Sequence, residues 1–290
     1  MQVGTEVVST QKSVKYLGIM LDSKLTYWNQ LKHASKKASE ITVTLSRLMA
    51  NTHGPLYSKR KLLMAVIHST VLYGSEIWAD VLKKDTYRKY IGAVQRKGAL
   101  RVASAYRTVS EPAVLVISGI IPIDLLAWER KEIYTKKDTV NVEDIRKQTR
   151  QNVIQKWQQR WNSERRGRWT ARLITNINDW VQREHGEINY YLTQLFSGHG
   201  YFQMYLYHIG KRENGKCTYG DSECDDANHT FFECVRWADE RNALKNKLDK
   251  MNADNIVSCM LRSEENWIDV AIFAEAILRR KKEDLDSNIP

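Results

Sequence analysis

A run of eighteen residues, CTYGDSECDDANHTFFEC, contains three of the chain's four cysteines and one of its seven histidines. The spacing is C-x6-C-x4-H-x4-C, and the residues concerned are Cys217, Cys224, His229 and Cys234. Three thiolates and one imidazole form one of the tetrahedral donor sets that structural zinc takes. A run this short and polar cannot bury a core of its own, so metal ligation would supply its folding free energy. The sequence therefore predicts a structural zinc site with these four residues as ligands.

The first gap in this run is wider than the two to four residues that usually separate a pair of zinc cysteines. The alternative is that the cysteines are unligated thiols, or that two of them form a disulfide. Three clustered cysteines leave one over in any disulfide scheme, and so few cysteines favour a reducing compartment. The fourth, Cys259, lies in an apolar segment and is expected to be a small buried hydrophobic residue.

Composition limits the classes of protein that the chain can be. At 290 residues with 42% hydrophobic residues, it is long and apolar enough for one large domain or two modest ones. No apolar run approaches the roughly 18 residues of a transmembrane helix, and no basic start precedes an apolar block as in a secretory signal. We therefore expect a nuclear or cytoplasmic protein that is not secreted. The net charge of +11 predicts a polyanionic partner, with nucleic acid favoured over a membrane surface or an acidic protein.

Apolar residues recur at helical spacing over most of the chain, so the predicted fold is mainly α. Residues 13–22, SVKYLGIMLD, alternate instead as a strand does, and apolar groups on both faces predict that this strand is covered. The clearest helical stripe covers residues 26–50. Charge rises and apolar content falls between residues 135 and 151, which predicts a domain boundary near residue 140.

Two basic segments are candidates for nucleic-acid binding. Lys32, Lys36 and Lys37 lie off the apolar stripe of the first helix. In IQKWQQRWNSERRGRWT, Trp157 and Trp161 share a helix face, and the arginines around them are Arg160, Arg165, Arg166 and Arg168. Arginine interleaved with tryptophan suits a phosphate backbone and stacked bases. The alternative is a helix with core tryptophans and a solvated basic edge.

Several segments, taken together and in order, resemble the C-terminal part of the polyprotein of insect-type, site-specific non-LTR retrotransposons. They are VKYLGIMLD, RVASAYRTVSEPAVLVISGIIPIDLLAWER, GRWT, SGHGYFQMYL and HTFFECVRWADER. The resemblance implies an N-terminal strand, a helical thumb-like bundle, and a helical linker domain with a small zinc-knuckle-like module. The implied segments are a palm-derived strand (1–25), the thumb-like domain (26–140), a basic, Trp-rich linker (141–212), a CCHC zinc-knuckle-like module (213–240) and C-terminal helices (241–290).

The resemblance also implies which chemistry the chain lacks. A reverse transcriptase holds its metal ions with palm aspartates upstream of the KYLG strand, and the endonuclease of the family lies further upstream. No paired-aspartate turn precedes Val14, and the adjacent Asp225 and Asp226 fall inside the cysteine run. Two-metal phosphoryl transfer needs convergent carboxylates. We therefore expect no catalytic residues and no polymerase activity from this chain alone. The expected partners are RNA or DNA and the palm and endonuclease regions of the parent polyprotein.

The knuckle departs from the family pattern at one position. The family usually has a cysteine three residues after the first, where this chain has Gly220. Cys224 either replaces that ligand across a wider turn, or the site is a remnant.

Three functions follow from these observations. The leading hypothesis is a nucleic-acid-binding fragment of a retrotransposon reverse transcriptase, and the second is a host-retained protein-interaction or scaffold module of the same origin. The third is an enzyme with a cysteine nucleophile and a histidine base. It is disfavoured because the same cysteines and histidine are clustered in the way that metal ligands are.

Overall fold

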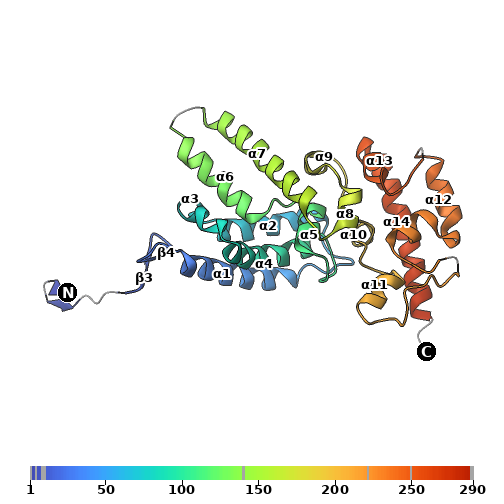
Figure 1. Ribbon diagram of the computed structural model, residues 1–290, viewed down its shortest axis with the longest axis horizontal. Helices are drawn as coiled ribbons and strands as arrows, with labels where there is room; N and C mark the ends of the chain where they lie inside the picture. The colour runs from blue at the N-terminus through green and yellow to red at the C-terminus, as the bar shows by residue number, and fades with distance from the viewer. Residues whose placement is uncertain are drawn as a thin grey trace. The chain divides into compact units, whose positions relative to one another are not determined.

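The computed structural model of the chain describes residues 2–3, 5–7, 11–138, 141–220, 222–248 and 250–287. Helices dominate the described residues, whose strands all lie near the N-terminus (Figure 1). The first of these, β1 (Gln2–Val3) and β2 (Glu6–Val7), form a short antiparallel pair. The predicted mainly helical fold with strand structure ahead of it is confirmed.

The chain divides into two compact units, each built from three segments. Unit 1 comprises Met1–Arg47, Leu63–Gly98 and Pro122–Val153. Unit 2 comprises Leu48–Leu62, Ala99–Ile121 and Ile154–Pro290. The domain boundary predicted near residue 140 falls on residues outside those that the structure describes.

Unit 1 contains a β-hairpin where the sequence predicts one long strand. β3 (Ser13–Tyr16) pairs antiparallel with β4 (Ile19–Asp22), and the last residue of β3 lies opposite the first of β4. Leu17 and Gly18 between them have φ angles of 44° and 85°, the pair of left-handed conformations that a tight two-residue hairpin turn requires. The prediction of a single strand is wrong, because alternation continues unchanged through a turn of this length.

The hairpin is also less covered than its apolar content predicts. Val14, Tyr16 and Leu17 are all exposed, and Leu17 keeps 76% of its surface accessible. A contiguous exposed apolar surface of this kind is typical of a site where another protein binds.

Asp22 connects the hairpin to the first helix. Its carboxylate accepts backbone N–H bonds from Thr26 and Tyr27 at 3.0 and 2.8 Å. The Thr26 bond is the largest of the causes that hold the pKa of Asp22 below its usual range. α1 (Trp28–Ser46) starts directly afterwards and buries Leu31 and Ala38 completely. The predicted stripe is thus confirmed, although the helix ends earlier than residue 50.

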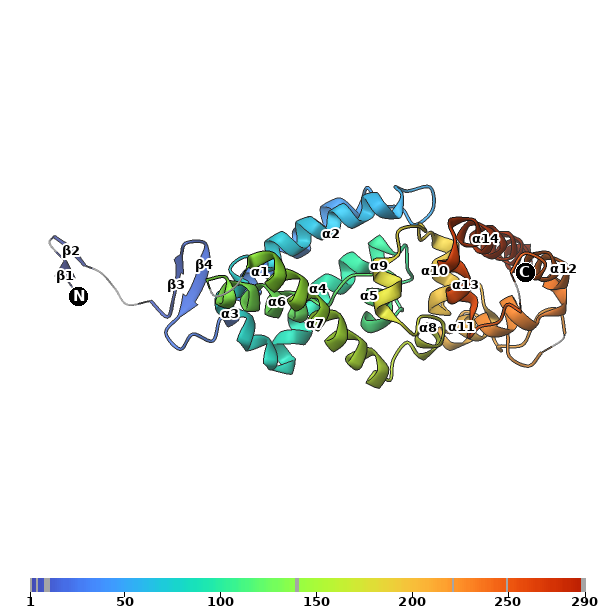
Figure 2. The same cartoon turned by 90° about the horizontal axis from the view of Figure 1, so that it is seen from above.

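The other helices with residues in unit 1 are α2 (Tyr57–Val71), α3 (Ser75–Trp78), the 3₁₀ turn η1 (Ala79–Lys83), α4 (Asp85–Val102), α6 (Ile123–Lys136) and α7 (Val142–Ser163). α3 and η1 pack on α6, as Figure 2 also shows for α3. Trp78 is fully buried in this core, and its indole N–H donates to the carbonyl of Tyr73 at 3.1 Å.

Unit 2 includes α5 (Glu111–Ile117), α8 (Arg168–Leu173), α9 (Ile177–Gln182), α10 (Tyr190–Ser197), α11 (Gln203–His208), α12 (Ala238–Lys245), α13 (Ile256–Arg262) and α14 (Glu264–Ser287). α14 contacts α10, α12 and α13, so it is the central helix of the unit. The aromatic core joins Trp180 to Phe196 and Trp267, with ring centroids 5.2 and 5.6 Å apart. Cys259 is buried on α13, as predicted.

No single helix in the described part of the chain is both long and apolar enough to cross a membrane. Only the bent pair formed by Tyr57–Val71 and Ser75–Lys83 meets that test by length and composition together.

Candidate metal centre

The first metal-ligand candidate lies in a tight turn of unit 2. The amide of Gly220 donates to the carbonyl of Cys217 at 3.1 Å, and the amide of Cys217 donates to the carbonyl of Ser222 at 2.9 Å. Gly220 has a φ of 79°, a conformation that costs a residue with a side chain about 1–2 kcal/mol. A second bond from the amide of Asp225 to the carbonyl of Gly215, at 2.8 Å, closes the base of this loop. The sequence between Gly215 and Asp225 therefore folds back on itself and presents Cys217.

The other two candidates sit at the two ends of one π-helical turn. The turn η2 covers His229–Glu233, and the amide of Cys234 donates to the carbonyl of His229 at 2.8 Å. The Asp226 carboxylate starts the turn by accepting from the amide of His229 at 2.8 Å. A bond from residue i+5 to residue i is the wide turn that is frequent at functional sites. This turn explains the H-x4-C spacing, because it places the side chains of His229 and Cys234, five residues apart, on the same side of the backbone.

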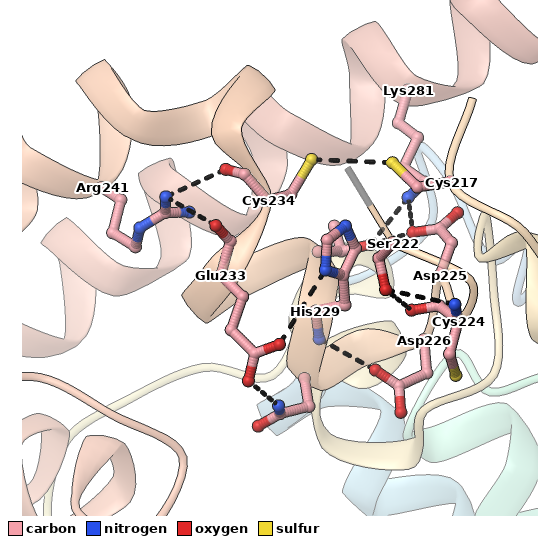
Figure 3. Close-up of polar contacts among 12 residues, drawn as sticks. Cys217, Ser222, Cys224, Asp225, Asp226, His229, Glu233, Cys234, Arg241 and Lys281 are labelled. Atoms are coloured by element: carbon pink, nitrogen blue, oxygen red, sulfur yellow. Dashed lines mark hydrogen bonds and ion pairs between the residues drawn. The ribbon is translucent and has the colours of Figure 1, made fainter. Parts of the chain in front are cut away.

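Three donors meet between these two segments (Figure 3). The sulfurs of Cys217 and Cys234 and one ring nitrogen of His229 all lie within 4.8 Å of one another. The two sulfurs are 3.9 Å apart, and all three side chains are at least 94% buried. Zn–S bonds of about 2.3 Å at a tetrahedral angle place two thiolates about 3.8 Å apart. Sulfur, sulfur and imidazole in this arrangement fit one zinc ion.

The alternative of a disulfide does not hold in this structure. None of the four cysteines, all of which lie in described residues, forms a disulfide. The 3.9 Å separation of Cys217 and Cys234 is nearly twice the length of an S–S bond.

The structure does not bring Cys224 into this group. Figure 3 shows its sulfur turned away from the other two sulfurs, and its amide donates to Ser222 Oγ at 3.1 Å. Burial raises the pKa of the Cys224 thiol, and the carboxylates of Asp226 and Asp225 raise it further. The surroundings of this side chain favour the neutral thiol, whereas a metal ligand must be a thiolate.

Sequence reasoning misses the residue that holds the loop in place, Lys281 of α14. Lys281 and Asp225 form an ion pair of 2.5 Å, and they are 2% and 0% exposed at the side chain. Thr230 joins them, because its hydroxyl accepts from Lys281 Nζ at 2.6 Å and donates to Asp225 at 2.7 Å. The second carboxylate oxygen of Asp225 accepts from the amide of Gln203, at the start of α11. Both carboxylate oxygens of Asp225 therefore accept hydrogen bonds from within the protein.

A signal for Lys281 exists in the sequence. It follows Phe273 and Ile277 and precedes Leu285 at intervals of four residues, so it lies on the apolar stripe of its helix. A lysine on such a stripe indicates a buried partner, whereas its neighbours in the run of four cations lie off the stripe. Phe231, between His229 and Cys234, packs against Phe202 and Phe273 with ring centroids 6.0 Å apart and is fully buried. The metal loop is therefore built onto the helical core of unit 2.

The three α1 lysines are all exposed in unit 1. Lys32 Nζ lies 5.3 Å from the centre of the Trp28 ring, and Trp28 stacks on Tyr87. Beside Lys37 lies a hollow of about 410 Å³ whose other basic lining residues are Lys15 and His33, two positions that sequence reasoning did not single out.

The arginine segment of unit 2 is engaged with its own chain. Glu164 accepts from Arg166 Nη2 at 2.9 Å, and Arg168 Nη1 donates to the carbonyl of Glu164 at 2.9 Å. Trp157 and Trp161 are each 2% exposed, so neither ring can stack on a base. The structure places these tryptophans in the core, as in the alternative interpretation of this segment. Arg160 and Arg165 are exposed.

Comparison with known proteins relates most of the chain to one class, the Pol polyproteins of retrotransposable elements. More particularly, the relatives belong to type-1 (R1) elements, which are non-LTR retrotransposons. The resemblance predicted from the sequence is confirmed.

A 115 kDa protein in the type-1 retrotransposable element R1DM of Drosophila melanogaster is 24% identical over 289 residues, which cover 93% of this chain and 28% of that protein. A retrovirus-related Pol polyprotein from element R1 2 of Nasonia vitripennis is 24% identical, over 79% of this chain and 60% of its own length. The corresponding Pol polyprotein of Bradysia coprophila is 22% identical, over 81% and 25%. The chain spans less than two thirds of each of these three relatives. No family model and no solved structure matches it.

Proposed function

We propose that this chain is a nucleic-acid-binding segment of an R1-type reverse transcriptase polyprotein, which grips primer and template and engages RNA or target DNA. The similarity to Pol polyproteins supports origin from such a polyprotein. The net charge of +11 supports nucleic acid as the binding partner. The observation that carries the proposal is the basic surface of unit 1, formed by Lys15, Lys32, His33, Lys36 and Lys37.

The lysine charges on this surface are accessible to a ligand. Among the described residues, neither Lys36 nor Lys37 forms an ion pair, and both are exposed. Lys15 and His33 line the hollow beside Lys37, so a second ammonium group and an imidazole lie next to the ammonium group of Lys37. A phosphate backbone is bound by such cations through the release of its counterions, without any requirement for base contacts.

We assign no catalytic step to this chain. Asp225 and Asp226 are the adjacent carboxylates, but Asp225 is held by Lys281, Thr230 and the amide of Gln203. A carboxylate so engaged cannot also converge on a pair of metal ions for phosphoryl transfer. Polymerisation belongs to the palm region of the longer polyprotein.

We also propose a structural zinc ion held by Cys217, His229 and Cys234. Its support is the donor set, its burial and the 3.9 Å separation of the sulfurs. The ion would supply folding free energy to the loop between Gly215 and Cys234. Through α11 and α14, on which this loop rests, it would stabilise one end of unit 2.

The nucleic-acid proposal is tested by measuring RNA affinity against salt concentration. The triple variant Lys32→Gln, Lys36→Gln, Lys37→Gln should weaken binding and reduce the slope of log affinity against log salt by about 2–3, at roughly 0.7–0.9 per phosphate contact. The matched control replaces Lys83, Lys136 and Lys147, whose charges are already offset by Asp80, Glu132 and Glu143. If both triples change the slope equally, net charge alone attracts the RNA, and the α1 surface is not the binding site.

A protein-interaction module is the second candidate function, and one observation favours it. An apolar groove of about 500 Å³ in unit 1 is lined by Tyr16, Leu17, Leu21, Tyr73 and Ile77 among others. VKYLGIMLD resembles the strand that leaves a reverse transcriptase palm, so the palm of the parent polyprotein is the partner that fits this groove. Leu17→Glu with Ile77→Glu should abolish palm binding and spare RNA binding. Loss of RNA binding with palm binding intact would reverse these assignments.

A further inference from the structure

The hollow beside Lys37 in unit 1 also carries polar groups that a phosphate contact does not use. Besides its basic groups, it is lined by three hydroxyl side chains, those of Ser69, Thr70 and Tyr73. The residues that line the hollow, all within the described ranges, include no aspartate and no glutamate. Its volume of about 410 Å³ lies within the range of small-ligand pockets, roughly 300–1,000 Å³. The hollow therefore has room for a sugar as well as for a phosphate group.

The hydroxyl protons in this hollow are already donated to the backbone. Ser69 Oγ and Thr70 Oγ1 both donate to the carbonyl of Val66, at 2.9 and 3.0 Å. The phenol of Tyr73 donates to the carbonyl of Leu17 at 3.1 Å. A hydroxyl group has one proton and two lone pairs. What these three groups retain for a ligand is therefore acceptor oxygen, which calls for a ligand with a hydrogen-bond donor.

Hydrogen bonds to the backbone also hold the lining of the hollow in place. Gln30, another lining residue, is 2% exposed, and its Oε1 accepts from the amide of Met20 at 2.9 Å. The bond from Tyr73 to Leu17 ties the tip of the β3–β4 hairpin to the residues that follow α2. Gly18 permits this close approach, because a Cβ atom there would lie 3.0 Å from the Tyr73 ring. A lining fixed in this way loses little conformational entropy when a ligand binds.

On the basis of the nucleic-acid binding proposed above, we propose that this hollow binds one ribonucleotide unit of an RNA strand and discriminates RNA from DNA through the 2′-hydroxyl group. Lys15 and Lys37 neutralise the phosphate, as they would for either kind of strand. The ribose 2′-hydroxyl donates a hydrogen bond to Ser69 Oγ or Thr70 Oγ1, and deoxyribose has no such donor. A deoxyribose in the hollow would displace water from these oxygens without replacing its hydrogen bond, which weakens binding.

The test compares single-stranded RNA and DNA of the same sequence, bound to the full-length chain at one fixed salt concentration. RNA should bind about 5-fold more tightly, which is the effect of one net hydrogen bond. RNA with 2′-fluoro in place of the hydroxyl keeps a ribose-like sugar conformation but lacks the donor, so it should bind with the affinity of DNA. If 2′-fluoro RNA binds as tightly as RNA, the strand is recognised by its shape, and the inference is wrong. Equal affinity for RNA and DNA also overturns it and leaves the proposed nucleic-acid binding standing, whereas binding of neither strand overturns both.

Variants locate the discrimination within the chain. Ser69→Ala with Thr70→Val should lower RNA affinity about 5-fold and leave DNA affinity unchanged, which also shows that the variant is folded. Thr44→Val is the matched control, because the exposed Thr44 hydroxyl donates to the carbonyl of Glu40 at 3.1 Å but does not line the hollow, and it should keep the RNA preference. Lys37→Gln should weaken binding of both strands by the same factor, because it removes a phosphate contact. An RNA preference that survives the Ser69 and Thr70 double variant would assign the discrimination to another site and overturn the inference.

Discussion

The cysteine run of unit 2 and the tryptophan–arginine segment that runs from the end of α7 to the start of α8 both carry residue types that predict ligand binding, yet the structure uses them in opposite ways. In the cysteine run, three of four predicted ligands converge within 4.8 Å. In the other segment, Trp157 and Trp161 are buried, and Arg166 is paired with Glu164. Metal ligands are recognisable by spacing along a short stretch of chain. Stacking and phosphate contacts depend on which face of a helix meets solvent, and residue types alone do not give that face.

The largest effect is expected from Cys234→Ser. This variant should release the metal and unfold the segment after Gly215, because ligation replaces a core in so small a loop. Metal analysis and hydrogen exchange of the same sample would measure both losses, and unit 1 should keep its protection. Cys224→Ser makes the same chemical change in the same run and should retain the metal. If Cys234→Ser kept a full equivalent of zinc, the proposed ligand set would be refuted.

The next largest effect is expected from Lys281→Met. Removing one partner of a buried ion pair leaves Asp225 charged and unpaired, which costs about 3–5 kcal/mol. Urea unfolding would measure the change in the free energy of unfolding of the chain. Lys282→Met is the control, since Lys282 is the exposed neighbour on the same helix. Equal effects of the two variants would mean that the pair adds nothing to the anchoring of the metal loop.

A smaller effect is expected from neutralising Arg165, Arg166 and Arg168 together. The variant should reduce RNA binding and flatten its salt slope, but by less than the α1 triple does. The reason is that Glu164 already offsets part of this charge, and Arg168 donates to a backbone carbonyl. The salt series designed for the α1 lysines measures the difference. An unchanged slope would assign these arginines to structure alone.

The smallest effect concerns pH. The hydrogen bond from Arg166, as the largest cause, lowers the pKa of Glu164 from 4.5 to about 2. A lowered carboxyl pKa stabilises the fold above pH 4.5, and this contribution is lost as the pH falls from about 4.5 to 2. Glu164→Gln should therefore flatten the acid limb of the stability profile in that window. Glu213→Gln, at an exposed glutamate, should leave it unchanged, and a Glu164→Gln profile that superimposes on the wild type would contradict the assignment.

Periodicity was sufficient to predict the helical fold and α1, because the buried residues Leu31 and Ala38 repeat at helical spacing. It could not predict the β3–β4 turn, since Leu17 and Gly18 adopt left-handed conformations without interrupting the alternation. In the metal centre, residue type and spacing predicted Cys217, His229 and Cys234. The displacement of Cys224 depends on how residues 218–223 fold, and the role of Lys281 depends on a contact between residues distant in the chain. Neither follows from a local pattern.

The buried pair of Asp225 and Lys281 also sets an order of events during synthesis. The two residues are 56 positions apart in the chain. At about 5–20 residues per second, a ribosome makes Lys281 roughly 3–11 s after Asp225. All three proposed metal ligands are synthesised before the lysine that holds their loop in place. The nascent chain therefore has an interval in which the proposed ion could bind before α14 packs against the loop and buries its ligands.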